Sequence, residues 1–152
     1  MISQDLAVSD HAEQAVLGAM LQSPEAWREV SSLESSDFAD SRHRITFTAM
    51  QRLAGQGKPI DYVLLTEELE QAGDLDNAGG PQYIGDLINE VVAENAAHYV
   101  ERVREASQRR QVARWLDEAH EAIAKPGADP VAILADLQAR TLATTPNPLA
   151  SY

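Results

Sequence analysis

The chain has 152 residues, 44% of them apolar and 5% aromatic, which is enough to fold around a hydrophobic core of its own. It contains no cysteine, which excludes disulfide bonds and thiolate metal sites and favours a reducing cytoplasm. The net charge of −12 lies in residues 1–100, which hold 17 acidic and 5 basic residues. The acidic side chains either keep the helix faces solvated or favour a protein partner over DNA.

Capping residues and helical periodicity predict two helices in the first 33 residues. Residues 1–9 are expected to be a flexible N-terminus. Asp10 then caps the first helix, with Glu13 as its capping-box partner. The pair Ser23-Pro24 begins the second helix, because proline is favoured at the first helical position. The apolar positions of these helices are Ala12, Val16, Ala19, Met20, Trp27, Val30 and Leu33.

Three further helices follow a polar loop over residues 31–40, in which Phe38 is the apolar anchor. The third runs over residues 41–53, and Gly55-Gln56-Gly57 ends it. Asp61 caps the fourth and Pro81 opens the fifth. Their apolar positions are Ile45, Ala49, Met50, Leu53, Leu64, Leu65, Leu69, Ile84, Leu87, Ile88 and Val91.

The last third of the chain predicts a helical hairpin. Asn95 caps a sixth segment that runs to residue 124, either as one long helix or as two broken near Ser107. Lys125-Pro126-Gly127 stops it, and Asp129-Pro130 starts a last helix. Two antiparallel helices on a short turn form a hairpin.

The sequence therefore predicts an all-α protein, a compact multi-helix head followed by a helical hairpin. We expect the head over residues 10–106, the hairpin over 107–143, and a linker or frayed tail over 144–152. The second arm of the hairpin offers few large apolar positions, which favours packing against the head or another copy of the chain.

No pattern in the sequence indicates catalysis, a cofactor or a metal. The stretch Gly55–Pro59 fails as a phosphate-binding loop, because its spacing is wrong and Pro59 replaces the required hydroxyl residue. The four histidines are scattered singly and are interpreted as surface or edge residues. No signal peptide or apolar span of roughly 20 residues is present, so we expect no membrane association. A hydrolase on a helical scaffold is the least supported alternative, since no catalytic constellation is visible.

Two sets of side chains are candidate partner-binding residues. Five arginines from Arg102 to Arg114 face only two local acids, Glu101 and Glu105, so they either contact an acidic partner or form pairs along their own helix. The second set consists of apolar positions on both arms of the hairpin. The candidate partner-binding residues are Arg102, Arg109, Arg110, Arg114, Leu116, Ile123, Leu134 and Leu137.

Five sequence blocks resemble the N-terminal domain of DnaB-type replicative helicases, in order and at matching spacing. The first block is DHAEQAVLGAML at 10–21. The second consists of DF and RHRITF within 37–47, and the third of GKPID and LEQAGDL within 57–75. The last two are GGPQYI at 79–84 and NAAHYVERVRE at 95–105.

The resemblance implies a helical head with a hairpin, dimers that assemble into a ring-shaped collar, and recruitment of primase or a helicase loader. It implies contact with DNA only through the full helicase. The family continues into an ATPase motor, which this chain does not contain, so we expect either a domain of a helicase or a stand-alone relative from a phage or mobile element that binds and regulates host helicase subunits.

Overall fold

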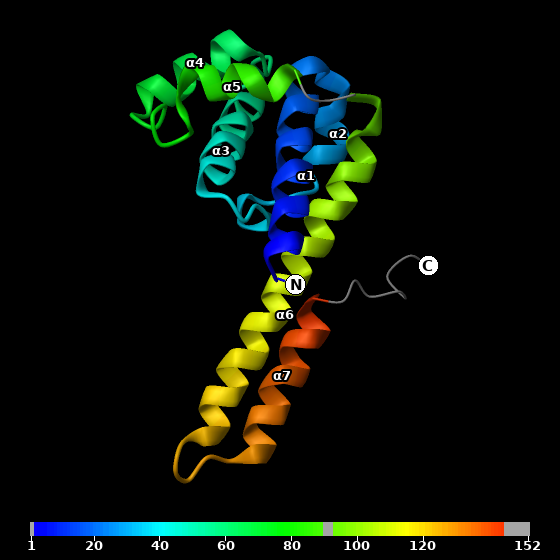
Figure 1. The fold of residues 1–152 in the computed structure, drawn as a ribbon, viewed down its shortest axis with the longest axis vertical. Helices are drawn as coiled ribbons and strands as arrows, with labels where there is room; N and C mark the ends of the chain where they lie inside the picture. Colours follow the sequence, from blue (N-terminus) through cyan, green and yellow to red (C-terminus); the bar gives the residue numbers. More distant parts are fainter. Residues whose placement is uncertain (1, 90–92, 145–152) are drawn as a thin grey trace. The chain divides into compact units, whose positions relative to one another are not determined.

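The computed structural model describes residues 2–89 and 93–144, with side chains from residue 10 onward, and all its regular elements are helical (Figure 1). The all-α prediction is confirmed. The α-helices are α1 (Ile2–Gln22), α2 (Trp27–Val30), α3 (Ser41–Gly55), α4 (Tyr62–Gln71), α5 (Gly80–Asn89), α6 (Ala96–Ala124) and α7 (Pro130–Thr144). The short 3-10 helices are η1 (Pro24–Ala26), η2 (Ser35–Asp37) and η3 (Ala93–Asn95). Within the described part of the chain, no helix is both long and apolar enough to cross a membrane.

The contacts divide the chain into two compact units, with the boundary between Gln108 and Arg109. This boundary lies within α6 and two residues beyond the one expected from sequence. We refer to the unit up to Gln108 as the head and to the unit from Arg109 as the hairpin.

The head has one main hydrophobic core, in which α1 packs against α3 and α5, and α4 packs against α3 and α5 (Figure 1). Phe38 and Phe47 lie at its centre, with ring centroids 4.9 Å apart. Phe38 is 1% exposed, as expected of an anchor that draws a polar loop onto the core. The predicted positions that are fully or almost fully buried are Ala12, Val16, Ala19, Met20, Val30, Leu33, Ala49, Met50, Leu53, Leu65, Leu69, Ile84 and Leu87.

Local signals set several helix ends as predicted. The side chain of Asp61 accepts a hydrogen bond from the Leu64 amide at 2.8 Å, so it caps α4. The turn after α3 closes with Lys58 N bonded to Leu53 O, and Gly57 takes a φ of +68° that a side chain would disfavour. The glycines before Pro59 therefore end a helix, as the sequence indicated.

Two expectations from the sequence are wrong. Helix α1 begins at Ile2, so Asp10 lies inside it and the first helix does not start after residues 1–9. Glu13 does not complete a capping box; its side chain is buried instead. Of the two alternatives for the sixth segment, the single helix is confirmed, because α6 is one helix of 29 residues with no break at Ser107. Val91 lies outside the described residues, as does the expected tail beyond Thr144.

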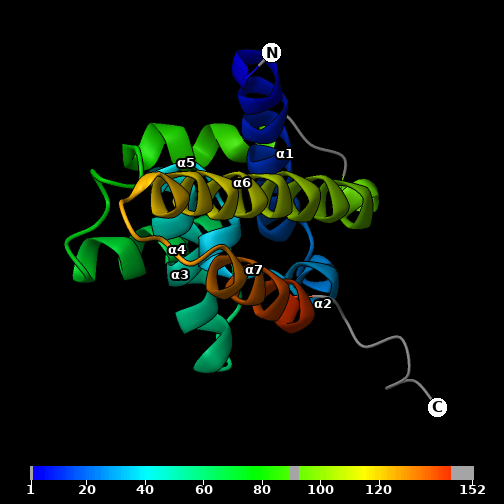
Figure 2. The ribbon, with the colours of Figure 1, turned by 90° about the horizontal axis from the view of Figure 1, so that it is seen from below.

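Within the hairpin, α7 runs beside the second half of α6, which both views show (Figures 1 and 2). Gly127 supports the turn between them with a φ of +78°. Asp129 accepts a hydrogen bond from the Val131 amide at 3.0 Å and so caps α7. The arms are joined by Arg140, whose guanidinium bonds Glu118 of α6 at 2.6 Å.

Candidate functional site

The predicted arginine series lies on α6, with Arg102 and Arg104 in the head and the others in the hairpin. Arg102 donates to His98 at 3.2 Å, one turn away. Arg104 pairs with Glu101 at 2.9 Å and donates to Ser32 at 2.7 Å, so it connects α6 to the loop after α2. Pairing along the helix, one of the two readings, therefore holds for Arg104.

The remaining arginines of the series belong to the hairpin. Arg109 and Arg114 are exposed and Arg110 is half-buried. Arg109 and Arg110 also interact with other groups of the chain. Their role in binding a partner stays a prediction.

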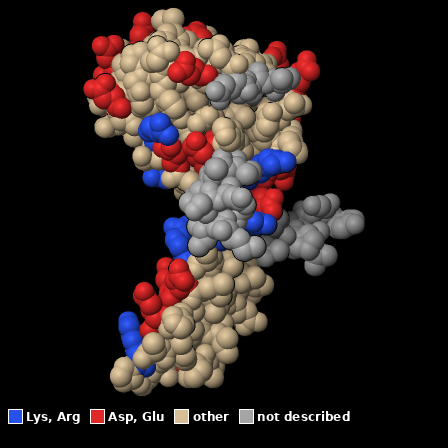
Figure 3. Space-filling model, viewed as in Figure 1, with Lys and Arg blue, Asp and Glu red and all other residues tan. Residues whose placement is uncertain are grey.

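The apolar candidates on the hairpin are largely open to solvent. Leu116 is 58% exposed, Ile123 46% and Leu134 66%, whereas Leu137 is half-buried. Three further apolar side chains, which were not among the candidates, are exposed on the same two helices: Val112, Val131 and Leu142. The hairpin face in Figure 3 is mostly uncharged, with basic and acidic groups along one edge.

The described part of the hairpin, residues 109–144, contains no fully buried side chain. The buried residues of α6 are Ala96, Val100 and Val103, all in the head, and α7 has none. Ion pairs of Arg140 with Glu118 and Asp136 connect side chains at the surface, where such pairs add little stability. The hairpin therefore leaves unused apolar surface of the kind that protein interfaces bury.

A second polar feature lies inside the head, where three side chains form a hydrogen-bonded chain across α1, α3 and α5. His43 has 0% of its surface exposed. Its Nδ1 lies 2.9 Å from Glu13 Oε1 and its Nε2 lies 2.6 Å from the hydroxyl oxygen of Tyr83. The interpretation of all histidines as surface or edge residues is wrong for His43, although His11, His98 and His120 are exposed.

Glu13 is held as a carboxylate although it is buried. Burial alone would raise the pKa of Glu13, but hydrogen bonds from His43 and from the amides of Ala39 and Asp40 outweigh burial and lower it below its ordinary value. The two amides donate to its oxygens at 2.9 and 3.2 Å. Since an ionised carboxylate can only accept, Nδ1 of His43 carries a proton, and in the neutral imidazole Nε2 accepts from the Tyr83 hydroxyl.

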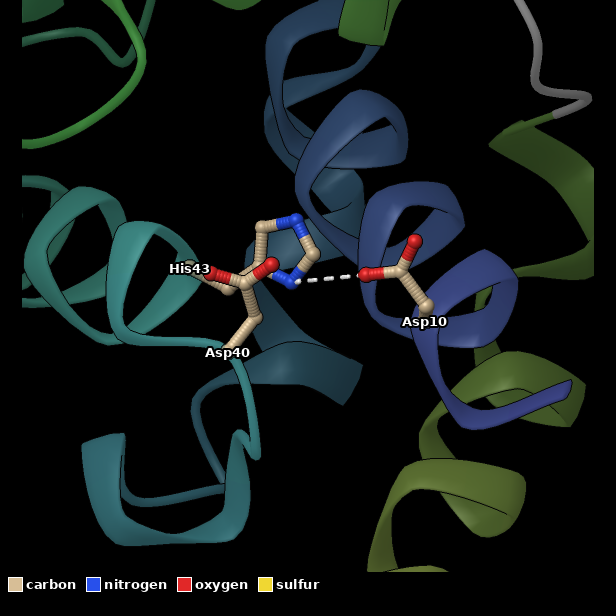
Figure 4. A group of neighbouring side chains, drawn as sticks. All are labelled: Asp10, Asp40 and His43. Atoms are coloured by element: carbon tan, nitrogen blue, oxygen red, sulfur yellow. Dashed lines mark ion pairs between the residues drawn. The ribbon is translucent and has the colours of Figure 1, made fainter. Parts of the chain in front are cut away.

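Two aspartates and an arginine surround the open edge of this chain. The Nδ1 atom of His43 lies 3.9 Å from Asp10 Oδ1, and Figure 4 shows Asp10 and Asp40 approaching the imidazole from α1 and from the start of α3. Arg42 pairs with Asp40 at 2.6 Å, and this hydrogen bond lowers the pKa of Asp40. The Arg42 guanidinium also lies 4.5 Å from the Tyr83 ring centroid, a cation–π contact.

The turn before α5 leaves room for the Tyr83 ring because residue 79 has no side chain. Gly79 has a φ of +104°, and a Cβ there would lie 2.6 Å from Cδ1 of the Tyr83 ring. Burial raises the pKa of Tyr83, with the nearby Arg42 guanidinium opposing part of that effect, so the hydroxyl keeps its proton at neutral pH. Glycine at position 79 therefore allows the Tyr83 ring to take the position from which its hydroxyl contacts His43.

Sequence reasoning did not find this polar chain, because its members are separated by 30 and 40 residues. One signal was present. Glu13, His43 and Tyr83 stand in three different blocks of the resemblance described above, which indicated that the positions matter without showing that they meet.

Comparisons with known proteins agree with this architecture. The family model described as the DnaB-like helicase N terminal domain matches residues 5–105. The replicative DNA helicase DnaB of Rhodothermus marinus is 39% identical over 102 residues, which are 66% of this chain and 11% of that protein. The chain thus spans only a small part of the curated relatives that it matches.

Two solved structures are similar to this chain over 86% of its length. One is the N-terminal domain of DnaB helicase from Mycobacterium tuberculosis, with a TM-score of 0.80 and 32% identity, over 86% of this chain and 94% of that one. The other is a DnaB-like replicative helicase described with its interactions with primase, with a TM-score of 0.67 and 28% identity, over 86% of this chain and 31% of that one. Since the family model covers residues 5–105, about two thirds of the sequence, this chain belongs to the family of DnaB-like helicase N-terminal domains.

Proposed function

We propose that this chain acts as the non-catalytic collar domain of a replicative DNA helicase, which associates with copies of itself and binds primase or a helicase loader. The observation that carries the proposal is the exposed apolar surface of the hairpin, to which Leu116 and Leu134 each contribute a side chain more than half exposed. The likeness to a helicase structure described with primase supports the choice of partner.

Self-association follows from the energetics of the hairpin. Fully burying a leucine contributes about 1.5–3 kcal/mol relative to leaving it in water, and the hairpin offers several such side chains. A second copy presents the same surface, so a two-fold contact would cover both sets at once. The acidic head, with its excess of carboxylates over bases, makes DNA an unfavourable direct ligand.

Sedimentation equilibrium on the intact chain tests self-association. We expect an oligomer for the unmodified chain and a monomer for Leu134→Asp, because the new carboxylate would have to be buried without a partner. Ala132→Asp is the matched control, since it adds the same charge at an exposed position on the opposite face of α7 from Leu134. An unmodified chain that stays monomeric at high concentration, or two variants that behave alike, would refute self-association through the hairpin.

Binding to a primase C-terminal domain tests the partner. We expect Arg109→Glu with Arg110→Glu to weaken that complex while circular dichroism shows unchanged helix content. Arg28→Glu with Lys58→Glu is the control, because it makes the same change in charge at exposed positions of the head. Equal effects of the two double variants would show that overall charge, and not this part of α6, governs binding.

A further inference from the structure

One buried imidazole nitrogen in the head faces three carboxylates. Nδ1 of His43 lies 2.9 Å from Glu13 Oε1 and 3.9 Å from Asp10 Oδ1. The ligand atoms of Asp10, Asp40 and His43 all lie within 4.8 Å of one another. Asp10 and Glu13 are three residues apart on α1 and so share one face. Figure 4 shows the Asp10 carboxylate turned toward His43 of α3.

The cluster around His43 contains more carboxylates than cations. Three carboxylates converge on the imidazole, and the cation beside them is Arg42, which is paired with Asp40. Carboxylates that are close together and partly removed from water repel one another strongly, so a bound cation would relieve that repulsion.

The donor set and its spacing identify the kind of cation. One imidazole nitrogen with carboxylate oxygens suits a first-row divalent metal better than Mg²⁺ or Ca²⁺, which favour oxygen alone. Around a tetrahedral Zn²⁺, with bonds of roughly 2.0–2.2 Å, neighbouring ligand atoms lie about 3.3 Å apart. Binding would require Asp10, whose side chain is 40% exposed, to bring its oxygen from 3.9 Å to that separation from His43 Nδ1.

We propose that Asp10, Asp40 and His43, with Glu13 beside them, form a binding site for one divalent transition-metal ion, with Zn²⁺ as the best fit. The ion joins α1 to the start of α3 and replaces the proton between Glu13 and His43. The ring proton moves from Nδ1 to Nε2, and the Tyr83 hydroxyl turns its own proton away so that its oxygen accepts from Nε2 at the 2.6 Å separation already present. A histidine that binds a metal through one ring nitrogen ordinarily donates a hydrogen bond from the N–H of the other.

The test uses the intact chain, freed of metal with a chelator and titrated with ZnCl₂ alone. Calorimetry should show one ion per chain, and the melting temperature should rise, because a ligand that binds only the folded state stabilises it. ¹⁵N spectra of the imidazoles should show the His43 proton moving from Nδ1 to Nε2. An absence of saturable binding up to about 1 mM, or unchanged His43 resonances, would overturn the proposal.

Matched variants separate this site from adventitious binding. Asp10→Asn should weaken Zn²⁺ binding at least tenfold and still fold, because Asp10 is half-exposed and outside the core. Asp76→Asn makes the same change at an exposed loop position and should leave binding unchanged. If Asp10→Asn binds Zn²⁺ normally, or if the ion shifts only the resonances of the exposed histidines, the site is not the one proposed.

Discussion

Replacing Glu13 by glutamine tests whether the buried polar chain stabilises the head. Glu13 accepts from His43 Nδ1 and the Asp40 amide through one oxygen and from the Ala39 amide through the other. Glutamine keeps one of these oxygens and places an NH₂ group opposite the remaining donor. One buried donor then loses its acceptor, and the bond from His43 loses its negative partner.

The expected loss follows from these two changes. An unsatisfied buried donor costs about 1–3 kcal/mol, and hydrogen bonds to charged groups contribute about 1.5–3 kcal/mol, against about 0.5–1.5 for neutral ones. The sum predicts a destabilisation of about 2–4 kcal/mol. This is a large share of the roughly 5–15 kcal/mol that stabilises a typical domain.

Urea unfolding followed by tryptophan fluorescence measures this loss. The chain has two tryptophans, Trp27 in the head and Trp115 in the hairpin, so a Trp115→Phe background makes the signal specific to the head. Trp27 lies 6.2 Å from Phe47 between ring centroids and therefore reports on the core. Glu67→Gln, at an exposed position of α4, is the control and should change stability by less than about 0.5 kcal/mol.

A loss of less than about 1 kcal/mol for Glu13→Gln, with an unchanged slope against urea, would refute this reasoning. It would mean that water or a rearranged loop replaces the carboxylate at little cost. A loss equal to that of Glu67→Gln would mean that the polar chain adds nothing to the stability of the head.

Three further predictions concern the same core. The pKa of Glu13 is lower in the folded head than its ordinary 4.5. The ionised carboxylate therefore stabilises the head above about pH 4.5, and this stabilisation is lost as the pH falls through the folded pKa. The urea midpoint should fall in that range, and it should fall less steeply in Glu13→Gln. Gly79→Ala should cost more in urea unfolding than Gly73→Ala, because both have positive φ but only at Gly79 does a Cβ meet the Tyr83 ring; equal losses would exclude that clash. Phe47→Ala should cost about 3–5 kcal/mol, because the ring is fully buried, and a smaller loss would indicate that the core collapses to fill the space.

Local chemistry in the sequence was sufficient to predict much of the fold. Asp61 caps α4, and Gly57 ends α3, because these signals depend on residues three to five positions apart. The apolar stripes identified most of the core, since a helix repeats its buried face about every turn. Five blocks of sequence were sufficient to indicate the family, which the comparisons confirm.

Other features depended on distant neighbours. The motif at Asp10 and Glu13 satisfied the pattern of a capping box, but α1 begins at Ile2, so the amides that such a box would cap are already bonded within a helix. Glu13 instead meets the amides of Ala39 and Asp40, which only the packing of α1 against the start of α3 makes available.

The sequence by itself determined where most of the helices lie, which faces are apolar, and that the second arm of the hairpin has few large apolar residues. Tertiary structure alone decided the environment of His43, a lone histidine in the sequence that the fold surrounds with Glu13, Tyr83 and two aspartates. The physical reason is that helix propensity and capping act over a few residues, whereas hydrogen bonds and charges act through space between segments that only folding brings together.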